Sequence, residues 1–299
     1  EIAFMGKTYT VEEATFDSFK GMDIALFAGG SISKDFAPHA VKAGAVVIDN
    51  SSAFRMDPEV PLVVPEVNPQ AILKHKGIIA NPNCSTIIMV MALKPIYDLA
   101  KIKRVIVSTY QAVSGAGKEG IDELDAQVRE HSEGREMTAN ILPSASAEKH
   151  YPIAFNLIPQ IDVFCDNLYT KEEMKMVNET KKIMEDYEMR ITATTIRVPV
   201  YRSHSESVNI ELEKEVDLGA MREALAKFPG VTVQDDPSKQ EYPMPLYTSE
   251  KDDVYVGRLR RDESCEKSYN MWVVGDQIRK GAALNTLQIA ETMIKNGWI

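Results

Sequence analysis

The sequence predicts a two-part α/β protein, in which a parallel sheet covered by helices is followed by an α+β unit. In the first third, short apolar runs that end in glycines or small polar residues alternate with a segment of helical character. The runs are "DIALFAGGS" (23–31), "AVVIDNSS" (45–52) and "GIIANPN" (77–83), and the helical segment is "DFAPHAVKAG" (35–44). Short buried strands joined by helical crossovers indicate a parallel sheet with helices on both faces.

The middle of the chain indicates a different kind of sheet. "RVIVSTYQAV" (104–113) has the pattern of a strand and leads into the helix-like "KEGIDELDAQVREH" (118–131). The stretch 193–216 is rich in β-branched residues, and its end alternates apolar and polar residues as a half-buried strand does. These features predict an α+β domain with a mixed or antiparallel sheet. Apolar residues at helical spacing in 281–298 predict a closing helix.

Composition and charge exclude several classes of protein. The 299 residues are 44% hydrophobic and 26% charged, which is ordinary for a globular chain that buries a core. The net charge is −10 and no basic stripe is present, so neither nucleic acid nor an anionic membrane is an expected partner. No apolar run approaches the ~20 residues that span a bilayer. Three widely spaced cysteines suit a reducing compartment and offer no metal-type pairing, so we expect a soluble, cytoplasmic protein without a metal site.

Cys84 is the first candidate for chemistry. It lies in "NPNCSTIIMVMAL" (81–93), where the capping-type residues Ser85 and Thr86 precede a continuous apolar run, so a buried helix is expected to begin at or next to the cysteine. A helix N-terminus stabilises anions, and we therefore expect a lowered thiol pKa and donors for an oxyanion. Pro82 fixes the approach of the chain, and Asn83 adds a polar side chain. The alternative is a small buried hydrophobe.

Among the five histidines, His204 is the best partner for a thiol. It lies in "IRVPVYRSHSES" with Arg197 and Arg202, at the end of a strand-like segment. An imidazole suits proton transfer near neutral pH, and a guanidinium binds carboxylate or phosphate through two hydrogen bonds. A structural histidine and surface ion pairs are the alternatives.

"GAGKEG" (115–120) formally matches a dinucleotide-binding fingerprint, but its context does not. The fingerprint requires a second parallel strand soon after the helix, whereas the segment that follows residue 131 has several prolines and no strand pattern. We therefore interpret 114–117 as a flexible loop that allows close backbone approach to a ligand, or as a plain connecting turn.

Five motifs in order resemble the aspartate-semialdehyde dehydrogenase family over essentially the whole chain. They are "NPNCST", "STYQAVSGAGKEG", "YTKEEMKMVNETKKIM", "IRVPVYRSHSESVNIE" and "IRKGAALNTLQIAE". The resemblance implies a Rossmann-type NADP-binding domain, incomplete here, formed by 1–83 and 281–299. It further implies a catalytic and dimerisation domain at 84–280, of the glyceraldehyde-3-phosphate-dehydrogenase-like type. The implied reaction makes aspartate 4-semialdehyde from aspartyl phosphate with NADPH, in lysine, methionine and threonine biosynthesis, and the implied assembly is a homodimer, sometimes paired into tetramers.

The resemblance also implies a role for individual residues. Cys84 would be the nucleophile and His204 the general acid/base, passing through a thiohemiacetal and a thioester. The substrate would be bound by Asn83, Gln111, Glu172 and Arg197, and the phosphate by Arg55 and Lys175. The NADP contacts would be Ala28, Gly29, Gly30, Ser31, Ser114, Gly115, Pro152 and Asn285. Judged on local sequence alone, Glu172 and Lys175 would be a solvated ion pair and Arg55 a surface charge.

The family begins with a strand and a glycine-rich turn that have no counterpart before "EIAFMGKTYTVEEA". We therefore expect the first β-α-β unit of the nucleotide-binding domain to be missing from this chain, which would weaken pyrophosphate binding and expose a sheet edge. An inactive fragment is then one alternative. The others are a related reductase of the N-acetyl-glutamyl-phosphate or glyceraldehyde-3-phosphate type, a cysteine hydrolase and a non-catalytic scaffold.

Overall fold

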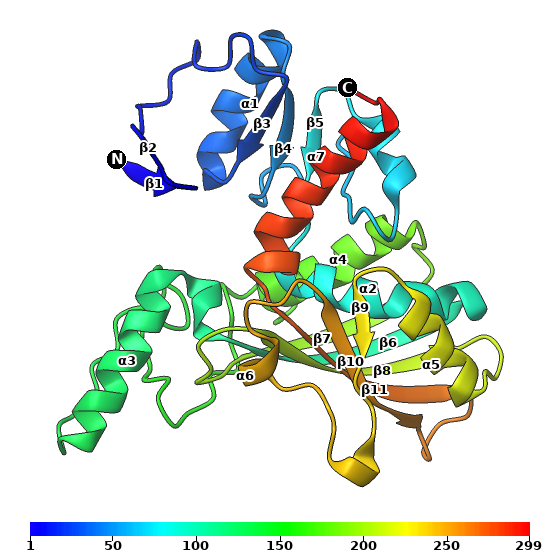
Figure 1. Ribbon diagram of the computed structural model, residues 1–299. Helices are drawn as coiled ribbons and strands as arrows, with labels where there is room; N and C mark the ends of the chain where they lie inside the picture. Colours follow the sequence, from blue (N-terminus) through cyan, green and yellow to red (C-terminus); the bar gives the residue numbers. More distant parts are fainter.

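The computed structural model describes residues 1–299 and contains a small parallel sheet and a large mixed sheet, as drawn in Figure 1. The small sheet has the strand order β3-β4-β5, with β3 (Ile24–Phe27), β4 (Val46–Asp49) and β5 (Ile78–Ala80) all parallel. Helix α1 (Ser33–Lys42) packs on it, and α7 (Leu284–Asn296) contacts β4 from the far end of the sequence. The outlying elements of this half are the exposed hairpin β1 (Ile2–Phe4) and β2 (Lys7–Tyr9), and the 3-10 turns η1 (Gly30–Ile32) and η2 (Pro69–Lys74).

The large sheet has the order β7-β6-β8-β11-β10-β9, with parallel outer pairs and antiparallel inner pairs. Its strands are β6 (Ile102–Gln111), β7 (Arg190–Arg197), β8 (His204–Leu212), β9 (Val231–Val233), β10 (Val254–Arg261) and β11 (Ser268–Gly275). Three helices cover one face, namely α2 (Cys84–Leu99), α4 (Lys171–Met184) and α5 (Leu218–Lys227), and no long helix packs on the opposite face (Figure 1). The remaining elements are η3 (Val113–Ala116), the projecting α3 (Lys118–Ser132), η4 (Pro237–Lys239), the short α6 (Pro245–Thr248) and the π-helix η5 (Arg279–Ala283).

Helix α2 forms the centre of the main hydrophobic core. Every residue from Ser85 to Ile96 except Lys94 is buried, so the helix is apolar all round, as expected for an element enclosed between a sheet and other helices. Each fully buried aliphatic side chain contributes roughly 1.5–3 kcal/mol. Because packing holds α2 on all sides, its first turn, which begins at Cys84, is held in place. None of the helices combines the length and the apolar composition that crossing a bilayer requires.

The predicted fold class is confirmed, with one correction to the strands. The stretch 193–216 contains two strands, β7 and β8, and β6 lies between them in the sheet. Pro199 cannot donate a backbone hydrogen bond, and Ser203 has a φ of 75°, so the chain leaves the sheet after Arg197 and re-enters it at His204.

The strand register places residues far apart in sequence in parallel rows. Gln111 pairs with Arg197, and two residues earlier Thr109 pairs with both Thr195 and Glu206. Because alternate residues of a strand share a face, His204 lies on the same face as Glu206, which is the face covered by α2. One polar row, containing Arg197, Gln111 and His204, therefore lies where the strands meet the start of α2.

Candidate active site

Cys84 is the first residue of α2, as the sequence predicts. The cap differs from the prediction, because Asn83 and not Ser85 or Thr86 is the N-cap residue, and its side chain accepts a hydrogen bond from Thr86 N at 3.2 Å. Asn83 thereby satisfies one of the free amides at the helix start, and Cys84 is presented at the end of β5 and its following turn.

A cleft of about 230 Å³ surrounds the sulfur and collects most of the predicted substrate residues. Its lining comprises Ser52, Arg55, Asn83, Cys84, Gln111, Gly115, Ile161, Glu172, Lys175 and Arg197. His204 does not line this cleft itself but lies immediately behind Gly115. The lining residues come from distant parts of the chain. They belong to the loop after β4, the start of α2, the end of β6, η3, the segment before α4, α4 itself and the end of β7.

Glu172 is the central acid of this cleft. It is 5% exposed and accepts hydrogen bonds from Asn83 Nδ2 at 2.9 Å, Gln111 Nε2 at 3.3 Å and Lys175 Nζ at 3.1 Å. Burial alone would raise the pKa of this carboxyl, but Lys175 and Asn83 hold it below its ordinary value. Local sequence suggested a solvated pair, and instead the acid is a buried carboxylate that lines the cleft.

Arg55 is also buried, contrary to the reading of it as a surface charge. Its guanidinium donates to the carbonyl oxygens of Asn81 and Asn50, each at 2.9 Å, and to Glu179 Oε1 at 3.3 Å. A guanidinium has five N–H donors, so two remain for an anion in the cleft. Lys175, which also bonds to Asp162 at 3.0 Å, is the second cation of this wall.

Arg197 and His204 meet at Gly115. A Cβ at position 115 would lie 2.6 Å from Arg197 Nη1 and 3.4 Å from His204 Nε2. The predicted loop 114–117 is therefore an ordered 3-10 turn whose close backbone approach is made to these two side chains. Arg197 Nη1 donates to Ala112 O at 2.8 Å, while its buried Nε has no partner. Arg202 instead pairs with Asp276 at 2.6 Å, away from the cleft.

His204 is held neutral with its proton on Nε2. The Ala112 N–H donates to Nδ1 at 3.1 Å, so Nδ1 is the acceptor and the proton of the neutral ring lies on Nε2, which has no other partner. Burial, reinforced by Arg197, lowers the pKa of this imidazole well below its ordinary value. At neutral pH the ring therefore presents a hydrogen-bond donor beside Gly115.

The expected lowering of the Cys84 pKa is wrong. Burial, followed by the charge of Glu172, raises the pKa of this thiol to about 12, and Arg55 and Arg197 oppose the rise without overcoming it. The residue is partly exposed to the cleft, although protein atoms surround its sulfur densely. The helix N-terminus is thus outweighed by desolvation and one buried carboxylate.

Comparison with known proteins matches both halves of the chain. Residues 2–75 match the NAD-binding domain, and residues 93–280 the dimerisation domain, of semialdehyde dehydrogenases. An aspartate-semialdehyde dehydrogenase from Aquifex aeolicus is 57% identical over 100% of this chain and 87% of the relative, and one from Bacillus subtilis is 53% identical over 99% and 86%. The chain belongs to the aspartate-semialdehyde dehydrogenase family. The crystal structure of aspartate semialdehyde dehydrogenase II from Vibrio cholerae complexed with ASA superimposes with a TM-score of 0.90, at 46% identity over 98% of this chain and 86% of that one.

A second cleft lies next to Cys84. It has a volume of about 280 Å³ and shares Arg55, Asn83, Cys84 and Gly115 with the first cleft. Its other lining residues are Asn50, Pro82, Ser114, Gln277, Ile278, Gly281 and Ala282. Parallel sheets bind ligands outside the carboxyl ends of their strands, and this cleft lies beyond the ends of β4 and β5.

The predicted NADP contacts fall in four places. Ser114 and Gly115 line the second cleft, and the exposed residues Ala28 to Ser31 follow the carboxyl end of β3. Asn285 is instead fully buried, with its amide bonded to Val63 O at 3.0 Å and Asn81 Oδ1 at 2.7 Å. Pro152 lines neither cleft and lies in the segment whose next residues, Ile153 and Ala154, pack on α3.

Sequence reasoning missed three residues of the site. Glu179 lies seven residues after Glu172 on the same face of α4, so helical periodicity was an available signal. Gln277 donates to Ser114 Oγ, and a Cβ at Gly281 would lie 3.0 Å from Cys84 Cβ. Neither has a local signal, because both belong to the connection from β11 to α7 that only the fold brings to Cys84.

Proposed function

We propose that the protein is an NADP-dependent, phosphorylating aspartate-semialdehyde dehydrogenase. It reduces L-4-aspartyl phosphate to L-aspartate 4-semialdehyde through a thioester on Cys84, in the cytoplasm, on the route to lysine, methionine and threonine. The observation that carries this proposal is the single cleft that joins a thiol to one buried acid and three cations, Arg55, Lys175 and Arg197. These charges match a substrate with an ammonium, a carboxylate and a phosphate.

The cleft charges orient the substrate. Arg197, with an unpartnered Nε, takes the α-carboxylate, and Glu172 takes the α-ammonium, while Arg55 and Lys175 bind the acyl phosphate group. Gln111, the last residue of β6, is held by Glu172 and Thr109 through its side-chain amide and limits where the reacting carbonyl sits. Holding the reactants in one geometry supplies a large part of a catalytic advantage.

Cys84 supplies the nucleophile. Its sulfur attacks the carbonyl carbon of the acyl phosphate, the C–O bond to phosphate breaks, the thiol proton leaves with the departing phosphate, and the acyl group is retained as a thioester. The free amides at the start of α2 face the oxygen that becomes negatively charged. His204, with its proton on Nε2, is the acid–base group for the carbonyl oxygen, and Ala112 N–H fixes its tautomer. After burial, the charge of Glu172 is the largest cause of the raised thiol pKa. When the substrate ammonium pairs with Glu172, it neutralises this charge and so favours ionisation of the thiol.

The residues around the second cleft fit a nicotinamide nucleotide. Gly115 and Gly281 lack side chains where a Cβ would press on Arg197 and on Cys84, which keeps this cleft open down to the sulfur. Ser114, Gly115 and the segment 28–31 would hold the nucleotide. When bound there, NADPH supplies the hydride that reduces the thioester.

The test is phosphate-dependent reduction of NADP with aspartate semialdehyde, followed at the nicotinamide absorbance band. Cys84→Ala should remove turnover, and NAD in place of NADP should give a lower kcat/KM. Retained turnover in Cys84→Ala, or hydrolysis of the substrate without a change in absorbance, would contradict the proposal. N-acetyl-glutamyl phosphate, the substrate of the related reductases, has no free amine to pair with Glu172. It should therefore not react with this protein.

We also infer that two copies pair through the helix-free face of the large sheet. The match to a dimerisation domain supports a homodimer, and this face presents Tyr110 and Trp272, whose rings lie 5.5 Å apart. Trp272→Arg should convert the dimer into monomers in sedimentation analysis, whereas a dimer of unchanged stability would place the interface elsewhere.

A further inference from the structure

Helix α4 presents one polar side chain per turn toward the cleft and its surroundings. These residues are Glu172, Lys175, Glu179 and Lys182, at spacings of three, four and three residues, so they form a single stripe. Glu172 and Lys175 line the cleft, and the other two do not. Glu179 and Lys182 instead contact Arg55 with its loop, and Asn83, the residue before Cys84.

Lys182 binds the segment that carries Arg55. Its Nζ donates to the carbonyl oxygens of Arg55 at 2.8 Å, Asp57 at 2.6 Å and Val60 at 2.8 Å. An ammonium has three N–H donors, so all of them are committed to this one loop. The side chain thereby connects residues 55–60, which follow β4 of the small sheet, to α4, which packs on the large sheet.

Glu179 joins the same guanidinium to the start of α2. One carboxylate oxygen lies 3.3 Å from Arg55 Nη1, and the other accepts the backbone N–H of Asn83 at 2.6 Å. Asn83 directly precedes Cys84. A single buried side chain, 1% exposed, thus fixes the distance between the Arg55 guanidinium and the nucleophile.

We propose that Glu179 and Lys182 are positioning residues that hold Arg55 beside Cys84, so that the phosphate group is bound within reach of the sulfur. The inference rests on the proposed function in that it takes Arg55 as a phosphate ligand. Arg55 and Cys84 come from different segments around the cleft, and small displacements of such groups weaken binding and turnover strongly. Lys182 provides the ammonium group that bonds to the carbonyl oxygens of loop 55–60, so its removal leaves these oxygens without a cationic partner.

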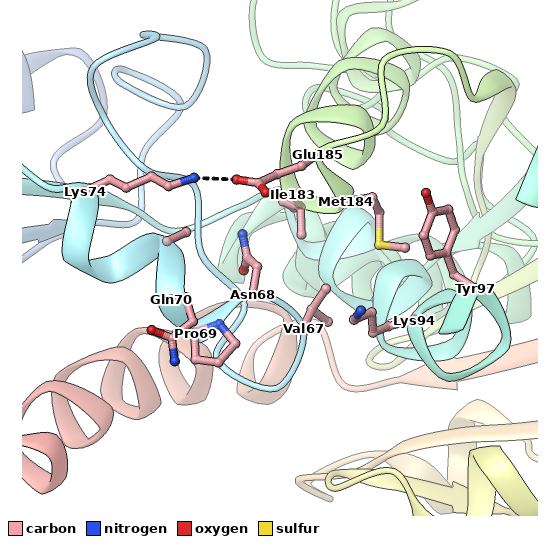
Figure 2. Close-up of a pocket in the computed structure, with 11 residues that line it drawn as sticks. Val67, Asn68, Pro69, Gln70, Lys74, Lys94, Tyr97, Ile183, Met184 and Glu185 are labelled. Atoms are coloured by element: carbon pink, nitrogen blue, oxygen red, sulfur yellow. Dashed lines mark hydrogen bonds and ion pairs between the residues drawn. The ribbon is translucent and has the colours of Figure 1, made fainter. Parts of the chain in front are cut away.

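Lys182→Met removes the three hydrogen bonds and retains most of the apolar stem. Lys74→Met is the matched control, because Lys74 Nζ bonds to Glu185 Oε1 at 2.6 Å and links the end of the same helix to the η2 segment, as Figure 2 shows. That pair is exposed and touches neither Arg55 nor Asn83. Both variants lose one lysine that connects α4 to the first half of the chain, but only one acts on Arg55.

The first measurement requires no turnover. Inorganic phosphate is titrated against the rate at which iodoacetamide alkylates Cys84, with the Cys84 peptide quantified by mass spectrometry. Phosphate should slow alkylation in the wild type and in Lys74→Met at the same concentration. In Lys182→Met, the phosphate concentration for half protection should rise on the order of ten-fold, as expected for loss of a charged hydrogen-bonded support. Equal protection in Lys182→Met and Lys74→Met would overturn the inference, as would a wild type that phosphate does not protect.

A double-mutant cycle separates positioning from general destabilisation. Once Arg55 is replaced in Arg55→Ala, adding Lys182→Met should weaken phosphate protection no further, because both changes remove the same interaction. Additive effects in the double variant would contradict the proposal. Should Lys182→Met fail to fold, Glu179→Gln, which keeps the shape of the side chain, should raise the same half-protection concentration, and an unchanged value there would equally overturn the inference.

Turnover provides the second measurement. In the phosphate-dependent assay, the KM for phosphate should rise in Lys182→Met while the KM for aspartate semialdehyde changes little. If phosphate protection shifts as expected and no variant or wild-type protein reduces NADP, the proposed function fails and the positioning of Arg55 stands.

Discussion

Gly115 lies directly against Arg197, with the position of its missing Cβ only 2.6 Å from Nη1 of the guanidinium. Arg197 cannot retreat freely, because the same Nη1 donates to Ala112 O at 2.8 Å inside the protein. The turn that resembles a dinucleotide fingerprint in sequence is therefore shaped to accommodate Arg197, the arginine that we propose binds the substrate carboxylate.

Gly115→Ala should weaken substrate binding without unfolding the protein. The added methyl group displaces Arg197, so the KM for aspartate semialdehyde should rise about ten-fold, which corresponds to about 1.4 kcal/mol. The thermal midpoint of unfolding, measured in parallel, should stay above the assay temperature, although the displaced Arg197 loses its bond to Ala112 O. A normal KM would mean that Arg197 is free to move or does not bind the substrate.

The reactivity of Cys84 should depend steeply on pH. A thiol with a pKa of about 12 is almost entirely protonated near neutral pH, so its alkylation by iodoacetamide should rise about ten-fold per pH unit between pH 7 and 9. The exposed Cys265 provides an internal reference in the same sample. A plateau in the Cys84 rate below pH 8 would show that the helix N-terminus prevails over burial after all.

Glu172→Gln should speed alkylation of Cys84 while slowing catalysis. After burial, the charge of Glu172 contributes most to the raised thiol pKa, so a neutral isostere should lower that pKa and accelerate alkylation at pH 8 several-fold. Turnover should fall, mainly through a higher KM for aspartate semialdehyde, because the substrate ammonium loses its partner. Asp162→Asn is a suitable control, since Asp162 contacts Lys175 but does not line the cleft. Slower alkylation in Glu172→Gln would refute this electrostatic account.

Glu206→Gln should stabilise the protein at alkaline pH. Glu206 lies one row behind His204, fully buried, and neither carboxyl oxygen has a partner, so burial raises its pKa well above 4.5. A raised pKa in the folded state means that stability is fully present below pH 4.5 and is lost as pH rises, because the unfolded chain releases this proton more readily. At pH 8, Glu206→Gln should increase the free energy of unfolding by about 1 kcal/mol or more.

The same substitution should have little effect at pH 4, and the exposed Glu213→Gln should have little effect at either pH. Urea unfolding at the two pH values measures the difference. A gain that is equal at pH 4 and pH 8 would attribute the effect to packing and not to the titration of Glu206.

Local sequence patterns were sufficient to predict the start of α2 and the three short strands of the small sheet. The polar residues before an apolar run placed the start of α2 at Cys84, and the repeated short runs predicted β3, β4 and β5 with the parallel arrangement that they have. Five ordered motifs were sufficient for the family. These features depend on capping, periodicity and residue order, which are properties of neighbouring residues.

The tertiary structure alone decided the electrostatics of the site. The pKa of Cys84 depends on burial beneath other elements and on Glu172 of α4, so the favourable position at a helix N-terminus did not determine it. Arg55 resembled a surface charge because its partners Asn81 and Glu179 lie far along the chain. Solvent exclusion and Coulomb interactions act between residues that are close in space, and only the complete fold determines which residues those are.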